Sequence, residues 1–183
     1  MLSKMASIYI TKVKTMSQGA LRATDKMPHN FLNIGLITLL FPNAKIIHCK
    51  RNPMDTALSI FRQKFSGDHP YSHTLTGLGD YYRHYQSLMA HWHNVLPFRI
   101  YDVEYESLIE NTEEEIRALL KFCDLPFNSK CLHFNETERP VATASHSQVR
   151  QPIYTSSVSA WRRYEKQMQP FVDALGSWEE RPL

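Results

Sequence analysis

The chain has little of several features that define common protein classes. It has three cysteines, six glycines, and no apolar run longer than Ile34–Phe41. So few cysteines rule out a disulfide-rich scaffold, and they predict free thiols in a reducing, cytoplasmic compartment. The apolar run is far shorter than the ~20 residues that span a bilayer. None of the glycines belongs to a Gly-x-x-x-x-Gly-Lys-Ser/Thr loop, which argues against a nucleoside kinase.

Size and charge narrow the remaining possibilities. The 183 residues suit one domain, with 43% hydrophobic and 21% charged residues. The net charge of +3 permits anionic ligands. Without a dense Lys/Arg stripe, it does not indicate nucleic-acid binding. Residues 1–18 carry scattered charges and no continuous apolar segment, so we expect neither a signal peptide nor a membrane anchor.

Residues 45–61 are the most informative segment. They read as a buried strand, a basic turn at Lys50 and Arg51, and a helix that begins at Pro53. Asp55 falls in the first turn of this helix, where the helix dipole favours a negative charge. A strand that leads into a helix N-terminus can bind an anion. Arg51 at the strand end and Ser59 two turns along the helix could therefore contact one phosphate. On spacing alone, a solvated Arg51 and a helix-packing Ser59 are the more common arrangement.

Strand and helix patterns alternate through the first two-thirds of the chain. This alternation predicts an α/β fold with a parallel sheet flanked by helices. The expected strands are 21–25, 45–49 and 98–105. The expected helices are 4–18, 28–40, 53–65, 75–95, 112–123 (with a capping box of Thr112 and Glu115) and 157–168. Ligands bind at the carboxyl ends of such strands, so we expect Lys26, Arg51 and the Glu104–Tyr105 pair to share one crevice.

Five blocks of sequence, in order, resemble the sulfotransferase family. The chain is most similar to bacterial sulfotransferases that carry tetratricopeptide repeats, and more distantly to protein-tyrosine sulfotransferases. The blocks are TDKMPHNF (24–31), LFPNAKIIHCKRNPMDTALSIF (40–61), YYRHYQSLMAHWHNVLP (81–97), VEYESLIENTEEEIRALLKFCDLPF (103–127) and VATASHSQVRQPIYTSSVSAWRRYE (141–165).

The resemblance implies a P-loop-NTPase-like fold and a reaction. The family transfers a sulfuryl group from 3′-phosphoadenosine-5′-phosphosulfate (PAPS) to an acceptor hydroxyl. It implies an N-terminal helical segment (1–20), an α/β core (21–127), and a nucleotide-closing loop with a C-terminal helix (128–183). The expected partners are PAPS, its product 3′,5′-adenosine bisphosphate, an unidentified hydroxyl acceptor, and an upstream tetratricopeptide-repeat region.

The resemblance also assigns residues. It makes Arg51 and Ser59 the contacts of the nucleotide's 3′-phosphate, and Lys26 the cation beside the transferring sulfuryl group. Tyr105 matches a nucleotide-contacting tyrosine. The closing loop, residues 145–154, supplies Ser145, Gln148, Val149 and Arg150. From the residues alone, Tyr105 could equally be a core aromatic, Lys26 a surface lysine, and the loop a solvated surface segment.

Part of the family pattern is missing. No Pro-Arg-Ser-Gly-Thr string, which would cradle the 5′-phosphosulfate after a first strand, occurs in the chain, and the acidic base that follows it has no counterpart. We therefore expect the C-terminal part of a sulfotransferase domain, without its first strand and phosphosulfate loop and with little or no activity. The alternative is a non-catalytic nucleotide-binding remnant. Ala160 and Gln63 stand where basic residues are expected, with Arg62, Arg162 and Arg163 as neighbouring substitutes.

We expect no metal cofactor. His91 and His93 are close in sequence, but positions i and i+2 of a helix point about 200° apart, so one ion cannot readily take both.

Overall fold

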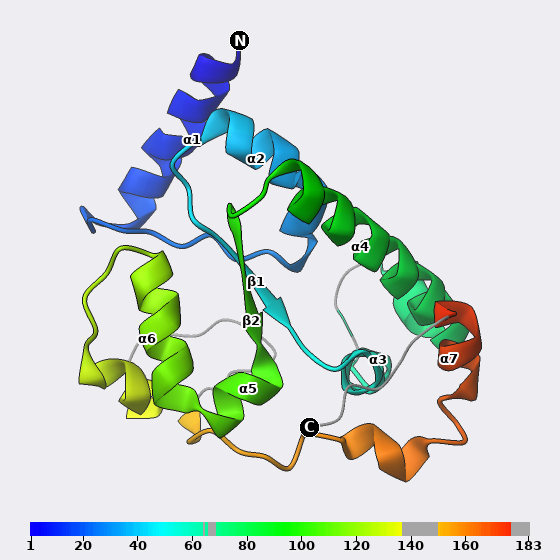
Figure 1. The fold of residues 1–183 in the computed structure, drawn as a ribbon. Coiled ribbons are helices and arrows are strands. Elements are labelled where there is room, and N and C mark those ends of the chain that lie inside the picture. The colour runs from blue at the N-terminus through cyan, green and yellow to red at the C-terminus, as the bar shows by residue number, and fades with distance from the viewer. Residues whose placement is uncertain (64, 66–68, 137–149, 177–183) are drawn as a thin grey trace.

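The computed structural model describes residues 1–63, 65, 69–136 and 150–176 (Figure 1). The strands are β1 (Ile46–Lys50) and β2 (Ile100–Glu104). The helices are α1 (Leu2–Met16), α2 (Ile34–Leu40), α3 (Pro53–Phe61), α4 (Leu75–Val95), α5 (Tyr105–Glu110), α6 (Thr112–Phe122) and α7 (Gln169–Leu175). The 3-10 segments are η1 (Pro28–Asn33), η2 (Pro70–His73), η3 (Ser129–Glu136) and η5 (Ala160–Tyr164).

Strands β1 and β2 form the two-stranded parallel sheet of the described residues, which confirms the predicted parallel pairing. The register places Ile46 opposite Ile100 and His48 opposite Asp102. The connection from β1 to β2 runs through α3, η2 and α4, as a crossover between parallel strands requires.

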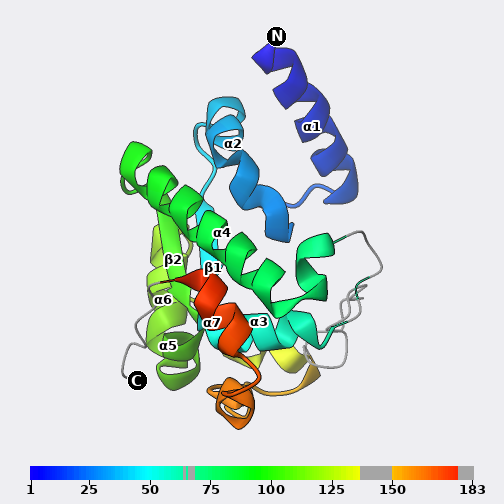
Figure 2. The ribbon, with the colours of Figure 1, turned by 90° about the vertical axis from the view of Figure 1, so that its right-hand side faces the viewer.

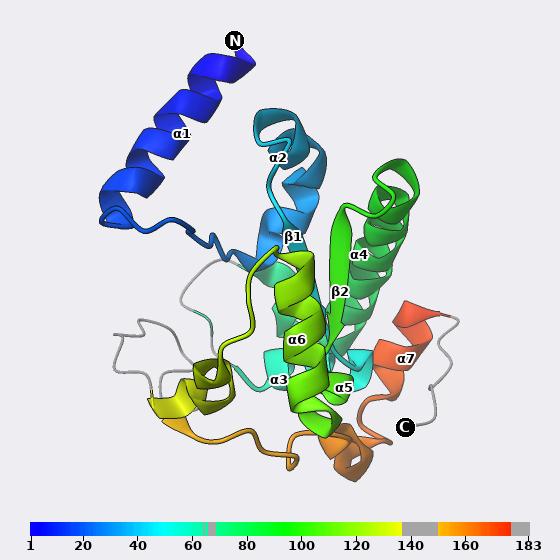
Figure 3. The same cartoon turned by 60° about the vertical axis from the view of Figure 1, so that its left-hand side comes forward.

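Helices cover both faces of this sheet, with α4 on one side and α6 on the other (Figure 3). On the α4 side, Ile100 is buried together with Ile34 and Met89. On the α6 side, Tyr101 stacks on Phe122 with ring centroids 5.0 Å apart. Successive strand residues point to opposite faces, so one strand serves both layers.

A second hydrophobic core joins α3, α4, α7 and η5. Its buried members are Met54, Ala57, Leu58, Leu78, Trp161, Met168, Phe171 and Leu175. Helix α7 lies along α4 (Figure 2). The close approach depends on Gly79, where an added Cβ would lie 2.6 Å from the Phe171 carbonyl oxygen and 2.7 Å from the Ala174 Cβ. This core fixes the C-terminal segment against the helix that follows β1.

Helix α1 lies at the periphery of the molecule and has no buried residue (Figure 1). Its contacts are mainly with α2. None of the described helices is both long enough and apolar enough to cross a membrane.

The predicted strand at 21–25 is wrong. These residues have no assigned strand and are exposed. Strand pairing needs a neighbour, and the sheet of the described residues consists of β1 and β2. The Asp25 carboxylate of this segment instead accepts hydrogen bonds from the side chains of Tyr9 and Asn30.

Several helix predictions differ from the structure. The helix predicted at 4–18 spans Leu2–Met16, and the helix predicted at 28–40 begins as the 3-10 segment η1. The helix predicted at 53–65 ends at Phe61. The predicted capping box is also wrong, because Thr112 is the first helical residue and its hydroxyl donates to the Leu108 carbonyl at 2.8 Å. The helix predicted at 157–168 is replaced by η5 and the later α7. Ser159 adopts a left-handed conformation (φ 55°), which prevents a continuous helix from 157, and Pro170 sits in the first turn of α7, where proline is tolerated.

Candidate functional site

The site begins where β1 leads into α3. Asn52 caps the helix, its side-chain oxygen accepting from the backbone N–H groups of Met54 and Asp55 at 2.9 and 3.2 Å. Pro53 and Asp55 occupy the first turn, as predicted. The backbone N–H of Asn52 donates to the Glu106 carboxylate at 2.9 Å, which ties this turn to the start of α5, directly after β2. Arg51 therefore lies directly after β1, next to a turn whose backbone is fixed by the helix cap and by the bond to Glu106.

A pocket of about 420 Å³ opens beside this turn. It is lined by Arg51, Asp55, Leu58, Ser59, Arg62, Gln63, Tyr154, Ser156, Ser157, Ala160 and Arg163. The structure thus brings Arg51 and Ser59 together on one pocket; their role there stays a prediction. Three arginines against one aspartate make the lining cationic, which suits an anionic ligand.

Arg51 is held on two sides, and one of its buried nitrogen atoms has no partner among the described residues. Its terminal nitrogen donates to the Ser157 carbonyl at 2.7 Å, and its guanidinium lies 5.0 Å from the centroid of the Tyr105 ring. The Tyr105 and Ser157 hydroxyls are hydrogen-bonded at 3.1 Å. The Nε of Arg51 is buried and has no hydrogen-bond partner among the described residues. A buried donor without a partner costs about 1–3 kcal/mol, so this atom favours a ligand that supplies an acceptor.

Asp55 organises the far wall of the pocket, a role that the sequence interpretation missed. It is buried, with 2% of its surface exposed, and its carboxylate accepts from Ser159 N at 2.7 Å and Trp161 N at 3.0 Å. These bonds hold the start of η5 against α3. Its position in the first turn of α3 suggested a favourable interaction with the helix dipole; nothing in the sequence pointed to the partners 104 and 106 residues away.

Tyr82 of α4 lies behind the same turn. Its hydroxyl donates to the Arg51 carbonyl at 3.5 Å. Burial, together with the nearby Glu104 and Glu106 carboxylates, raises the pKa of Tyr82 to about 12. The phenol therefore stays neutral at physiological pH.

The expected single crevice forms only in part. Tyr105 contacts Arg51 as described, but Lys26 is exposed and does not line the pocket. The side chain of Glu104 pairs with Lys50 instead. Lys26 follows the segment 21–25, which does not join the sheet, and so its position relative to the strand ends is not set by strand pairing.

The first half of the predicted closing loop, residues 145–149, lies outside the described residues and includes Ser145, Gln148 and Val149. Arg150 is half-buried and is not among the residues that line the pocket. Tyr154, the last residue of the predicted loop, does line the pocket, as do Ser156 and Ser157 just after it. Arg62 and Arg163, two of the three substitutes for the missing basic residues, line it as well.

Comparison with known proteins identifies the family. A sequence model of a protein family, described as "Sulfotransferase family", matches residues 1–129. The chain belongs to the sulfotransferase family. The relationship inferred from the five blocks is therefore confirmed, and with it the membership in a family of transferase enzymes.

Curated relatives are longer than this chain. An uncharacterised protein of Aquifex aeolicus is 43% identical over 178 residues, which cover 96% of the chain and 23% of the relative. A protein-tyrosine sulfotransferase of Drosophila melanogaster is 27% identical over 179 residues, covering 88% of the chain and 34% of that protein. The chain thus spans about a quarter to a third of these relatives' length.

A solved structure supports the predicted fold. The sulfotransferase domain from the curacin biosynthetic pathway superposes with a TM-score of 0.59 at 16% identity, covering 90% of this chain and 61% of that domain. At this identity the likeness concerns the fold, and it confirms the predicted P-loop-like α/β class.

Proposed function

We propose that this chain carries the 3′-phosphate half of a PAPS-binding site and belongs to a sulfotransferase that acts on an acceptor hydroxyl. The observation that carries the proposal is the buried, unpartnered Nε of Arg51 in a pocket lined by three arginines. A phosphate oxygen would satisfy this donor, and the guanidinium fork matches phosphate geometry. Ser59, exposed on the same pocket, adds a hydroxyl donor.

The chain supplies residues for the 3′-phosphate side of this nucleotide but lacks the string expected for its 5′-phosphosulfate side. On the 3′-phosphate side the pocket supplies Arg51, Ser59, Arg62 and Arg163, and Tyr105 lies against Arg51 where a nucleotide could contact it. On the 5′-phosphosulfate side, the Pro-Arg-Ser-Gly-Thr string does not occur in the 183 residues. When bound, PAPS supplies a sulfuryl group for in-line transfer, whose developing negative charge requires positioned cations.

We assign Lys26 and the loop residues Ser145, Gln148, Val149 and Arg150 to this proposal as well. Lys26 would provide the cation near the sulfuryl group, and the loop would cover the nucleotide. The transfer step needs no metal ion in this scheme. The free cysteines suit a reducing compartment such as the cytoplasm.

The chain on its own is proposed to bind the nucleotide's 3′-phosphate end with little or no sulfuryl transfer, since it lacks the 5′-phosphosulfate string and the acidic base. A non-catalytic nucleotide-binding role is the second candidate. Both candidate functions use the same pocket, and they differ only in whether a sulfuryl group is transferred.

Calorimetric titration with 3′,5′-adenosine bisphosphate tests the site. We expect Arg51→Ala to weaken binding by about 1.5–3 kcal/mol, or roughly 10- to 150-fold, because a charge-assisted contact is lost. Ser59→Ala should cost less, about 0.5–1.5 kcal/mol. Arg83→Ala is the matched control, since Arg83 pairs with Asp80 on the exposed surface of α4. Unchanged affinity in both Arg51→Ala and Ser59→Ala, with the fold intact by circular dichroism, contradicts the assignment.

A further inference from the structure

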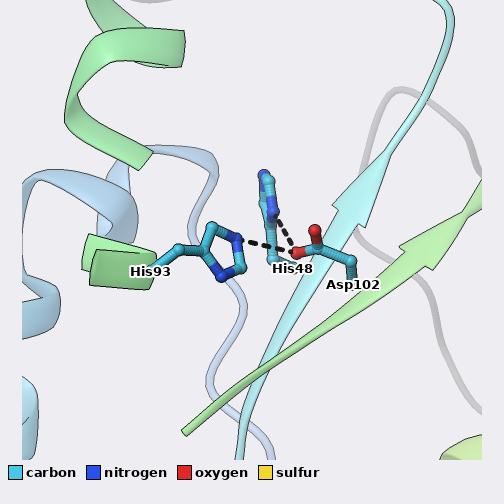
Figure 4. A group of neighbouring side chains, drawn as sticks. All are labelled: His48, His93 and Asp102. Carbon is cyan, nitrogen blue, oxygen red and sulfur yellow. Dashed lines mark hydrogen bonds and ion pairs between the residues drawn. The ribbon is translucent and has the colours of Figure 1, made fainter. Parts of the chain in front are cut away.

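Three side chains outside the pocket converge between the sheet and α4. His48 comes from β1, Asp102 from β2 and His93 from α4 (Figure 4). The Nδ1 of His48 lies 2.8 Å from Oδ1 of Asp102, and the Nε2 of His93 lies 3.2 Å from the same oxygen. His48 and His93 are far apart in the sequence, so the three side chains come together only in the folded chain.

The register of the sheet and the packing of α4 explain the convergence. His48 and Asp102 are partners in the parallel ladder, so their side chains emerge on one face. Trp92 fixes the rotation of α4, because its indole N–H donates to the Phe31 carbonyl at 2.8 Å and its ring packs on the Ile34, Met89 and Ile100 cluster. The next residue, His93, is thereby brought to the strands.

The ligand atoms are spaced for one ion. The three candidate atoms all lie within 4.8 Å of one another. Ligands on a tetrahedral zinc with bonds of 2.0–2.1 Å stand about 3.3 Å apart, so small movements of the three side chains would admit the metal. Two imidazoles and one carboxylate are a ligand set that zinc and related divalent transition metals use.

The surroundings orient these ligands. The Tyr85 hydroxyl is hydrogen-bonded to Nε2 of His48, which leaves Nδ1 directed at Asp102. Lys50 lies 3.5 Å from the second oxygen of Asp102 and is itself paired with Glu104. Such outer contacts are typical of metal-binding histidines and carboxylates. The two carboxylates outweigh the one ammonium group, which leaves a net negative charge suited to a cation.

We propose that His48, His93 and Asp102 form a binding site for a divalent transition metal, with zinc as the best match. The ion would link α4 to both strands through these three side chains. Three protein ligands on a tetrahedral ion leave the fourth position for water. None of the three lines the arginine pocket, so the site is separate from the proposed 3′-phosphate site.

Zinc titration of the chelator-treated 183-residue chain tests this site. We expect binding of one Zn²⁺ per chain in calorimetry, and an absorption spectrum of tetrahedral Co²⁺ when cobalt replaces zinc. His93→Asn should weaken Zn²⁺ affinity at least 10-fold. The matched control is His91→Asn, an exposed histidine one position on the other side of Trp92, which should bind as the unchanged chain does.

A second measurement keeps the test independent of folding defects. Zn²⁺ should raise the melting temperature of the unchanged chain and of His91→Asn, and this rise should be lost in His93→Asn and Asp102→Asn. His93 is partly exposed, with 40% of its side chain accessible, so its replacement should leave the fold intact. Zn²⁺ affinity that is absent, or equal in His91→Asn and His93→Asn, overturns the site and leaves a hydrogen-bonded His–Asp–His group.

Discussion

The arginine pocket and the segment around Lys26 are held in place very differently. At the pocket, Asp55 and Arg51 each bond to backbone groups of residues 157–161, more than 100 positions away. A core that includes the fully buried Phe171 supports them. Residues 20–27, by contrast, are exposed and belong to no helix or strand. The two halves of the expected nucleotide site thus differ in how firmly the described fold positions them.

This difference indicates what the chain can do unaided. Binding of a 3′-phosphate needs only groups that the pocket already holds together. Sulfuryl transfer also needs cations and a base aligned on the 5′ side, within fractions of an ångström. We therefore expect binding and turnover to separate in this chain.

The largest expected effect concerns turnover. Transfer of labelled sulfate from PAPS by residues 1–183, to tyrosine peptides and other hydroxyl acceptors, should be at least about 10²-fold below that of a sulfotransferase with the Pro-Arg-Ser-Gly-Thr loop. The same preparation should still bind 3′,5′-adenosine bisphosphate, which serves as the folding control. Comparable turnover would mean that another segment supplies the 5′ side.

Matched leucine substitutions sharpen the contrast in packing. Leu175 is 3% exposed in the core of α3, α4 and α7, whereas Leu21 is fully exposed. Leu175→Ala should lower the free energy of unfolding by about 2–5 kcal/mol, because it removes buried apolar contacts and leaves a cavity. Leu21→Ala should change it by less than about 0.5 kcal/mol. Urea titrations measure both, and similar losses at the two positions would show that the N-terminal segment is packed after all.

The smallest effect is a pH dependence behind the pocket. The raised pKa of Tyr82 means that above pH 10 the unfolded chain releases this proton before the folded chain does. Its contribution to stability is therefore fully present below pH 10 and is lost between pH 10 and about 12. At pH 11 the loss should be about 1.4 kcal/mol relative to pH 8. Tyr82→Phe should lack this part of the loss in urea titrations at the two pH values, and an identical pH dependence in both proteins would contradict it.

Local patterns predicted the elements on which the pocket stands. The apolar run at 45–49, Pro53 and Asp55 placed β1 and α3, and the periodicity of 75–95 placed α4 correctly. These signals lie within a few residues of the structure that they specify. The same holds for the neighbourhood of Arg51 and Ser59, since one strand end and one helix carry both.

Long-range partners could not be predicted in this way. The segment 21–25 reads as a strand, but strand formation depends on a pairing neighbour elsewhere in the chain. The bonds from Asp55 to residues 159 and 161 have no counterpart in local sequence, and they help determine where η5 begins. His93 was weighed only with His91, whereas its neighbours His48 and Asp102 come from two strands. In each case tertiary contacts, not local preference, decide the outcome.

Phosphorus NMR of bound 3′,5′-adenosine bisphosphate tests the central claim most directly, because the two phosphates give separate signals. We predict that residues 1–183 shift or broaden the 3′-phosphate signal strongly and the 5′-phosphate signal weakly. The effect on the 3′ signal should be lost in Arg51→Ala and kept in Arg83→Ala. A 5′-phosphate signal that responds as strongly as the 3′ signal, or a 3′ response that survives Arg51→Ala, would contradict the assignment of this pocket to the 3′-phosphate.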